Sequence, residues 1–346
     1  LLIMKAFALL SLTTLLLAAN ACSDNEAPAG MNGQHAISFN AVASKQPRSA
    51  ATTTASLKSF VVYAFTGSKP LMENVTVSRD GGLWTYTPIA YWPETPVNFY
   101  AFSPDISNSS QITGVGSNMI PGYVNSGDID LLYAVNIGEY EKPTPVAINF
   151  RHAFSKVDVM LSSTNVDIQV KVSHVSLCNI YTTGTFLFPQ ATTSPADPEA
   201  VGSWADLKAN QKLLIFYAID NESQITLNSH PANLTEGTLN VQFFLPQQLS
   251  KVDLAGNDYV GNFIQVDCEI FDTSSGAKLW PKSDTPSYML VPQTDLGRII
   301  FPLKTSNVDE WKMGYSYVYN IAINNPSVLD AIEFEPTVDE YAEINP

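Results

Sequence analysis

The stretch Ser59-Phe60-Val61-Val62-Tyr63-Ala64-Phe65 decides the fold of this chain. Its apolar residues fall on both parities, whereas a strand with one face in water alternates apolar and polar residues. β-Branched and aromatic residues also favour strands over helices. The stretch therefore predicts a strand covered on both faces, in the interior of a β-sandwich.

Other runs along the chain have the same character. Val97–Ser103 predicts a second buried strand, and Leu239–Phe243 and Ile264–Ile270 alternate as sandwich strands with one wet face do. Near His174-Val175 an alternating run changes parity, which indicates a β-bulge. No amphipathic stretch longer than about two helical turns interrupts these strands.

Composition agrees with a large β-rich protein. The 346 residues are 45% hydrophobic, 11% aromatic and only 15% charged, with 22 prolines and 18 glycines spread between the short apolar runs. This predicts an all-β chain with enough core for two domains. The net charge of −15 argues against nucleic acid as a partner, because phosphates would be repelled.

The first residues have the pattern of an export signal. Met4-Lys5 precedes an uncharged run from Ala6 to Ala19, and Ala19-Asn20-Ala21-Cys22 follows. Small residues directly before a cysteine predict a lipoprotein signal peptide over residues 1–21 and acylation of Cys22. Ordinary cleavage, with Cys22 incidental, is the alternative. Residues 22–35 are small and polar and predict a tether.

The mature chain divides into two expected domains, residues 36–150 and 151–346. The first begins with an alternating strand, His35–Ala41, which places Ile37, Phe39 and Ala41 on one face. The segment from Val42 to Leu57 is rich in Thr, Ser and Ala. Its only charges are Lys45 and Arg48, so it predicts an exposed, protease-accessible loop.

Residues that carry chemistry are sparse, and we expect neither a catalytic site nor a cofactor or metal ion. The four histidines lie far apart without metal-ligand spacing: His35, His152, His174 and His230. Cys178 and Cys268 could form a disulfide in the oxidising periplasm. Cys268 also alternates with Val266 and Ile270, and a small core residue is the simpler interpretation.

Ordered short motifs give the chain a family resemblance. In the first half the motifs are, in order, the strand Ile37–Ala41, the Thr-rich loop with Arg48, and the aromatic runs Phe60–Phe65, Trp84-Thr85-Tyr86, Tyr91-Trp92-Pro93 and Phe99–Phe102. In the second half they are Asp130–Ala134, Phe150–Val157 and Trp311–Tyr319. Together with the lipoprotein signal, this order resembles the fimbrillin-like (Mfa-like) lipoproteins of Bacteroidales.

The resemblance implies a type V pilus subunit with two tandem transthyretin-like β-sandwich domains and no enzymatic activity. It also implies a place on the cell surface, in a fimbrium or as a lipoprotein anchored by its lipid in the outer membrane. It implies cleavage between Arg48 and Ser49, with Lys45 as a second candidate, which would release the first strand. A strand from another subunit would then fill the groove, in a homo- or hetero-polymer. Our candidate donor strand, which could equally be a plain edge strand, comprises Ile332, Phe334, Pro336 and Val338.

Two alternatives remain open at this point. The chain could be a surface glycan-binding lipoprotein in which exposed aromatic residues stack on sugars. Its five tryptophans would then have to be exposed, although tryptophan is more often a core residue in β-sandwiches. A secreted glycosidase is the weakest interpretation, because nothing in the sequence indicates a pair of catalytic carboxylates. Both as a pilus subunit and as a glycan-binding lipoprotein, the chain could bind a ligand on a host or bacterial surface.

Overall fold

The computed structural model of the chain describes residues 35–43, 53–114, 118–141, 144–192, 201–237, 239–325 and 337–340. These residues form strands β1 to β23 and two short 3₁₀ turns, η1 (Ser107–Ser109) and η2 (Ser287–Met289). No α-helix occurs in the described ranges, which therefore contain no helix long and apolar enough to cross a membrane. The predicted all-β class is confirmed.

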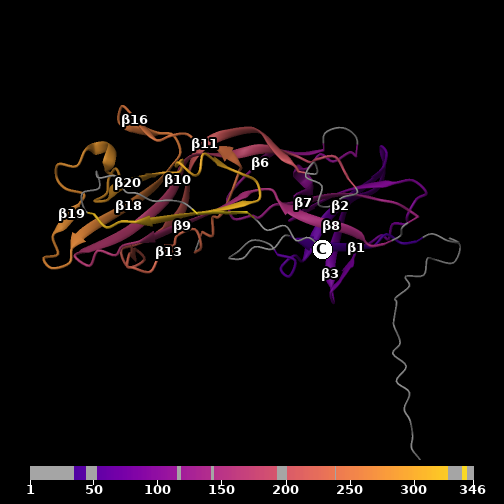
Figure 1. The fold of residues 1–346 in the computed structure, drawn as a ribbon, viewed down its shortest axis with the longest axis horizontal. Helices are drawn as coiled ribbons and strands as arrows, with labels where there is room; N and C mark the ends of the chain where they lie inside the picture. The colour runs from indigo at the N-terminus through magenta and orange to yellow at the C-terminus, as the bar shows by residue number, and fades with distance from the viewer. Residues whose placement is uncertain are drawn as a thin grey trace, which may run out of the picture.

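One seven-stranded sheet, here called the N-terminal sheet, occupies one end of the molecule (Figure 1). Its edge strands β1 and β4 contact each other, so the sheet curls around an apolar core. Its spatial order is β1 (Phe39–Ala43), β8 (Val146–His152), β7 (Leu132–Gly138), β5 (Val97–Ser103), β2 (Ser59–Thr66), β3 (Lys69–Asp80) and β4 (Leu83–Thr85).

Strand β2 is covered on both faces, as its sequence predicts. Phe60, Val62 and Ala64 point into the curled core of the N-terminal sheet. Val61 and Phe65, on the opposite parity, belong to a second apolar cluster on the other face of the sheet. Because successive side chains of a strand point to opposite faces, a strand between two cores must be apolar on both parities.

Two further sheets enclose a third core and are here called the C-terminal sandwich. The larger sheet has the order β11 (Ser203–Tyr217), β10 (Ile168–Leu187), β18 (Phe263–Asp272) and β19 (Lys278–Trp280), with β6 (Met119–Val124) and β12 (Ile225–Thr226) on β10 and β20 (Gly297–Pro302) on β18. The smaller has the order β13 (Ala232–Asn233), β9 (Ser155–Ser162), β22 (Tyr315–Ala322) and β23 (Thr337–Glu340), with β14 (Phe243–Phe244) on β9.

Two strand pairs complete the fold. They are β15 (Gln247–Gln248) with β21 (Glu310–Trp311), and β16 (Asp253–Ala255) with β17 (Asp258–Val260). The bulge expected near His174 is present, because the pairing of β10 with β18 shifts between Val172 and His174.

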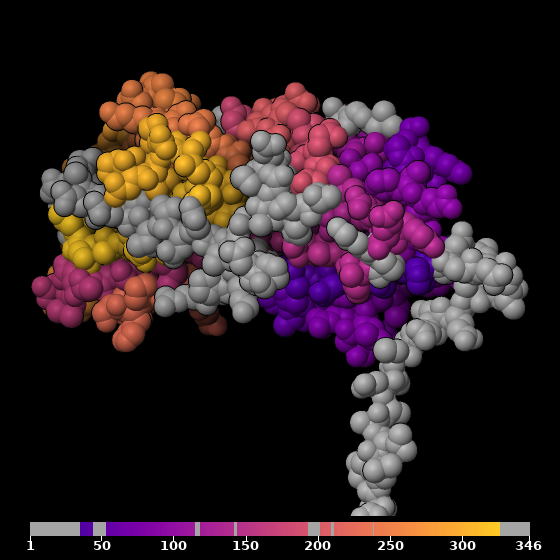
Figure 2. Space-filling view, turned by 45° about the vertical axis from the view of Figure 1, so that its right-hand side comes forward, coloured from indigo at the N-terminus to yellow at the C-terminus, as the bar shows by residue number. Residues whose placement is uncertain are grey.

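An aromatic cluster, here called the junction core, joins the two ends of the molecule. Phe102 and Tyr133 of the N-terminal sheet meet Phe186 at the far end of β10, together with Phe154 and Trp204. In Figure 1, β10, β11 and β6 reach from the C-terminal sandwich toward β7 and β2, and in Figure 2 pink atoms lie along the top between the orange end and the purple end. Strand β6 precedes the predicted boundary at residue 150 and pairs with β10, which follows it.

Two strand predictions were wrong in part. Leu239–Phe243 is not a strand until Phe243, because Asn240 adopts a left-handed φ of 48° and Leu239 is exposed. On the expected wet face of Ile264–Ile270, Gln265 and Asp267 are buried and Glu269 is half-buried. The two buried residues bond to each other, since Gln265 Nε2 donates to Asp267 Oδ1 (2.7 Å).

Candidate functional site

The first strand fills a groove at the edge of the N-terminal sheet. Strand β1 runs parallel to β8, with Phe39 opposite Val146 and Ala43 opposite Phe150. The predicted inward residues Ile37, Phe39 and Ala41 are 2%, 6% and 3% exposed, and Ala43 is fully buried beside them. Ser38 and Asn40 on the other parity are exposed. The strand therefore contributes its whole apolar face to the core.

Phe39 is the anchor of this strand. Its ring lies 5.9 Å from Phe60, 5.5 Å from Tyr86 and 6.0 Å from Phe99, each in an edge-to-face arrangement. Such aromatic contacts add stabilisation beyond the area they bury. Removal of β1 would leave this three-sided aromatic pocket open to water.

The residues just before β1 bond to a different part of the chain. Ile37 N donates to Ala90 O and Trp92 N donates to His35 O, both at 2.9 Å. Tyr86 OH donates to Ile37 O at 2.8 Å, and burial raises the pKa of Tyr86 to about 12. The segment is therefore held by residues 86–92 before Ser38 and by β8 after it.

A side chain closes the loop that follows β1. Ala43 N donates to Thr54 Oγ1 at 2.9 Å, and Thr54 Oγ1 donates back to Ala43 O at 2.9 Å. Arg79 fixes the same turn, because one of its Nη atoms donates to Thr54 O at 2.8 Å. The predicted cleavage residues Arg48 and Ser49, like Lys45 and Cys22, lie outside the described residues.

The candidate donor strand is described only at its end. Strand β23 pairs antiparallel with β22, with Val338 opposite Tyr317, and forms the edge of the smaller sheet of the C-terminal sandwich. Ile332, Phe334 and Pro336 lie outside the described residues. Within a single chain, then, the end of this run is an edge strand.

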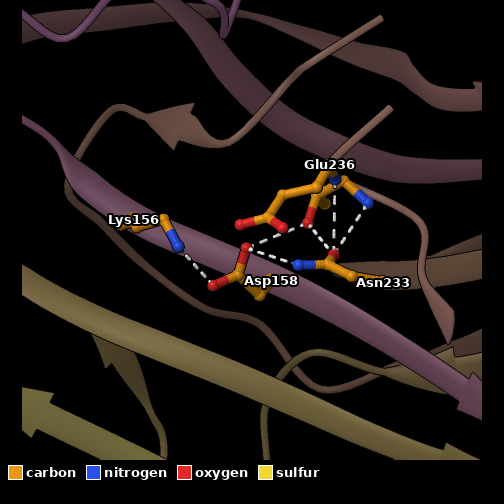
Figure 3. Close-up of polar contacts among 5 residues, drawn as sticks. Lys156, Asp158, Asn233 and Glu236 are labelled. Carbon is orange, nitrogen blue, oxygen red and sulfur yellow. Dashed lines mark hydrogen bonds and ion pairs between the residues drawn. The ribbon is translucent and has the colours of Figure 1, made fainter. Parts of the chain in front are cut away.

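Strand β9 carries a buried charged cluster on the face turned away from the sandwich core (Figure 3). Lys156, 1% exposed, contacts Asp158 through Nζ and Oδ2 at 2.5 Å. Thr235 Oγ1 and Asn233 Nδ2 both donate to Asp158 Oδ1, at 3.1 and 3.4 Å. Figure 3 shows Asp158 between Lys156 and Asn233, so its carboxylate is satisfied from both sides.

Two other sequence landmarks have structural roles. Asp130 Oδ1 and His152 Nδ1 lie 2.8 Å apart, and both side chains are buried. Trp311 Nε1 donates to Tyr319 OH (3.0 Å), and this hydroxyl donates to Leu303 O (2.9 Å). The first contact joins the segment before β7 to β8, and the second joins β21 to β22.

Cys178 and Cys268 are both free and buried. They lie on neighbouring strands, but Cys178 is opposite Phe263 and Cys268 is opposite Val172. This offset along the strands is too large for a disulfide, which needs Cα atoms within about 7 Å. The bridge that the sequence left open is not formed, and burial raises the pKa of Cys178 to about 12.

The described residues contain no cluster of three or more His, Cys, Asp or Glu side chains that could hold a metal ion. The tryptophan side chains pack against other parts of the chain. Trp92, Trp280 and Trp311 are buried; Trp84 packs on Phe60, and Trp204 stacks on Phe154. None of the five offers an open platform for a sugar.

Comparison with known proteins places this architecture. The fold is similar to that of a fimbrial protein from Bacteroides vulgatus ATCC 8482, with 14% identity, 89% of this chain and 99% of that chain covered, and a TM-score of 0.52. A weaker similarity, with 10% identity and a TM-score of 0.35, covers 82% of this chain and 94% of the C-terminally truncated tip fimbrial protein Mfa3 from Porphyromonas gingivalis.

A search of curated proteins found no match. The sequence does match the fimbrillin-like family over residues 47–340, which is most of its length. The chain therefore belongs to the fimbrillin-like family.

Proposed function

We propose that the chain is a subunit of a surface fimbria, exported as a lipoprotein through Cys22 and assembled by strand exchange. Cleavage after Arg48 releases β1, and a strand from another subunit takes its place. Family membership supports the fimbrial role. The observation that carries the assembly step is an edge strand with four buried side chains: Ile37, Phe39, Ala41 and Ala43.

The groove provides the driving force for assembly. Emptying it exposes the aromatic pocket of Phe39 and the backbone edge of β8, and refilling it restores both. Burying Ile37, Phe39 and the two alanines contributes roughly 5 to 10 kcal/mol before ordering costs. A strand of matching pattern from another subunit recovers the same contribution.

The way β1 is held makes its release local. It has a continuous ladder only with β8, and residues 35–37 add a short second contact with residues 90–92. No strand of the described chain continues the sheet beyond β1. Removing an edge strand leaves the remaining ladders of the sheet intact, so the acceptor subunit stays folded.

The test is the intact mass and N-terminal sequence of the protein recovered from the surface of its native host. We expect a terminus at Ser49 and ladders that resist SDS at low temperature. Arg48→Ala should abolish both, Lys45→Ala should change neither, and Cys22→Ser should remove the lipid from the precursor. An acylated Cys22 terminus without ladders would refute assembly by strand release.

A further inference from the structure

A small pocket, here called the polar hollow, lies where the base of the hairpin β16–β17 meets β10. Its volume is about 120 Å³, and it is lined by six residues from three parts of the chain: Asn179 and Tyr181 of β10, Gln248 of β15, and Ser250, Gly261 and Asn262 at the hairpin base. None of the six carries a charge, and five of them bear a side-chain amide or hydroxyl. Neither the groove of β1 nor the junction core accounts for this concentration of uncharged polar groups.

One wall of the polar hollow is the base of the hairpin, which is fixed by two hydrogen bonds. Ser250 N donates to Asn262 Oδ1 at 2.6 Å, and Asn262 N donates to Ser250 O at 3.1 Å. Gly261 approaches the same turn so closely that a Cβ would lie 2.1 Å from Lys251 O, and its φ of 83° also favours glycine. This wall is therefore held in one shape.

Asn179 fixes the opposite wall. It adopts a left-handed φ of 60° at a β-bulge in the pairing of β10 with β11, and bulges redirect side chains. Its Nδ2 donates to Gly261 O at 2.8 Å, and its carbonyl oxygen accepts from Asn262 Nδ2 at 2.5 Å. These two bonds tie β10 to the hairpin base, so both walls keep their relative positions.

Several hydrogen-bonding groups around the polar hollow have no partner among the described residues. Asn179 uses its Nδ2 but not its Oδ1, and Gln248 uses its Nε2, on Glu310, but not its Oε1. The hydroxyls of Ser250 and Tyr181 make no hydrogen bond within the described chain, although the backbone N–H of each residue does. None of these four atoms is a buried unsatisfied atom, so each is accessible from outside.

We propose that the polar hollow binds a neutral sugar, the terminal pyranose of a surface glycan. Two amide oxygens accept hydrogen bonds and two hydroxyls both donate and accept, which matches the hydroxyls along the edge of a sugar ring. The volume equals that of about four water molecules, so the hollow takes part of one ring and not a longer chain. The inference goes beyond fimbrial assembly, because it gives the subunit a ligand of its own.

The lining excludes other classes of ligand. No lysine, arginine or histidine lines the polar hollow to bind a phosphate, sulfate or sialic acid, and no carboxylate lines it to bind a cation. Glu310, which accepts from Gln248, is paired with Lys312 at 3.3 Å. The net charge of −15 also repels anionic glycans. An apolar ligand would leave the amide and hydroxyl groups unpaired.

Saturation-transfer NMR on the full, uncleaved chain carrying Cys22→Ser tests the inference. The probes are the methyl glycosides of galactose, glucose, mannose, fucose and N-acetylgalactosamine, with sialic acid and galactose sulfate as charged counterparts. We expect a neutral probe to bind with a Kd of about 1 mM, because a few neutral hydrogen bonds supply the affinity. The charged probes should not bind.

Variants locate the bound sugar. Ser250→Ala and Tyr181→Phe each remove one hydroxyl without a partner in the described chain, so the fold is retained, and each should weaken binding about fivefold. Asn179→Gly keeps the left-handed backbone, removes the amide and should weaken binding about tenfold. Tyr217→Phe is the matched control, because exposed Tyr217 lies outside the hollow, and it should leave the affinity unchanged.

A glycan array of host-cell glycans and bacterial surface polysaccharides identifies the source of the sugar. Binding to neutral members of either set, weakened by Ser250→Ala, supports the inference and names that source. Three results overturn it: no binding of any neutral probe at about 10 mM, binding that neither Ser250→Ala nor Tyr181→Phe changes, or preference for charged glycans. Since the chain is uncleaved throughout, such a failure leaves the proposed release of β1 standing.

Discussion

At the scale of single residues, the buried pair Lys156 and Asp158 shows how a charge is kept inside an apolar strand. The lysine ammonium group and two neutral donors surround one carboxylate, and this offsets the cost of desolvation. Loss of one partner would leave the other buried and charged.

We therefore expect Lys156→Met to lower the free energy of unfolding by about 3–5 kcal/mol, measured by urea denaturation. Lys212→Met is the matched control, because Lys212 is exposed, and it should change stability by less than about 0.5 kcal/mol. Adding Asp158→Asn to Lys156→Met should recover part of the loss. Equal stability of the single and double variants would contradict an uncompensated charge as the cause.

Tyr86 gives the groove a dependence on pH. Its hydroxyl ionises near pH 10 in the unfolded chain, and its folded pKa is raised to about 12. Its stabilisation is therefore complete below pH 10 and is lost as pH rises from 10 to 12. When the pH is raised from below 10 to near 11, the urea midpoint should fall less in Tyr86→Phe than in the parent chain. An identical fall would exclude Tyr86 as a source.

At the scale of elements, the direction of the backbone groups in β1 decides which substitutions it tolerates. Asn40 uses its N–H in the ladder with β8, and Ala41 does not. Asn40→Pro should therefore cost about 3 kcal/mol or more, and Ala41→Pro about 1 kcal/mol or less. Thermal midpoints of the two variants check this. Equal losses of stability in the two variants would contradict this register, in which Asn40 but not Ala41 donates its backbone N–H to β8.

At the scale of the whole molecule, the junction core couples the N-terminal sheet to the C-terminal sandwich. Trp204 stacks on Phe154 at 5.4 Å, and its Nε1 donates to Ala153 O at 2.6 Å.

Trp204→Ala should lower stability by about 3–5 kcal/mol and split one calorimetric transition into two, because the ends would then unfold separately. Exposed Tyr217, on the same strand β11, is the control, and Tyr217→Ala should leave a single transition. A single transition in both variants would place the coupling elsewhere.

The sequence by itself determined the strand content, the two-faced burial of Phe60–Phe65, the inward parity of Ile37, Phe39 and Ala41, and the bulge near His174. These features follow from local alternation of apolar residues, which has the same period as the strand that it specifies. The order of the family motifs is also a property of the sequence alone.

Only the tertiary structure decided the partners of each strand. The parallel pairing of β1 with β8 joins residues about a hundred positions apart, and the offset of Cys178 from Cys268 depends on the register of β10 with β18. The burial of Gln265 and Asp267 depends on polar partners that alternation does not reveal. Periodicity fixes which face of a strand is apolar, but the strand that lies beside it is fixed by packing across the whole chain.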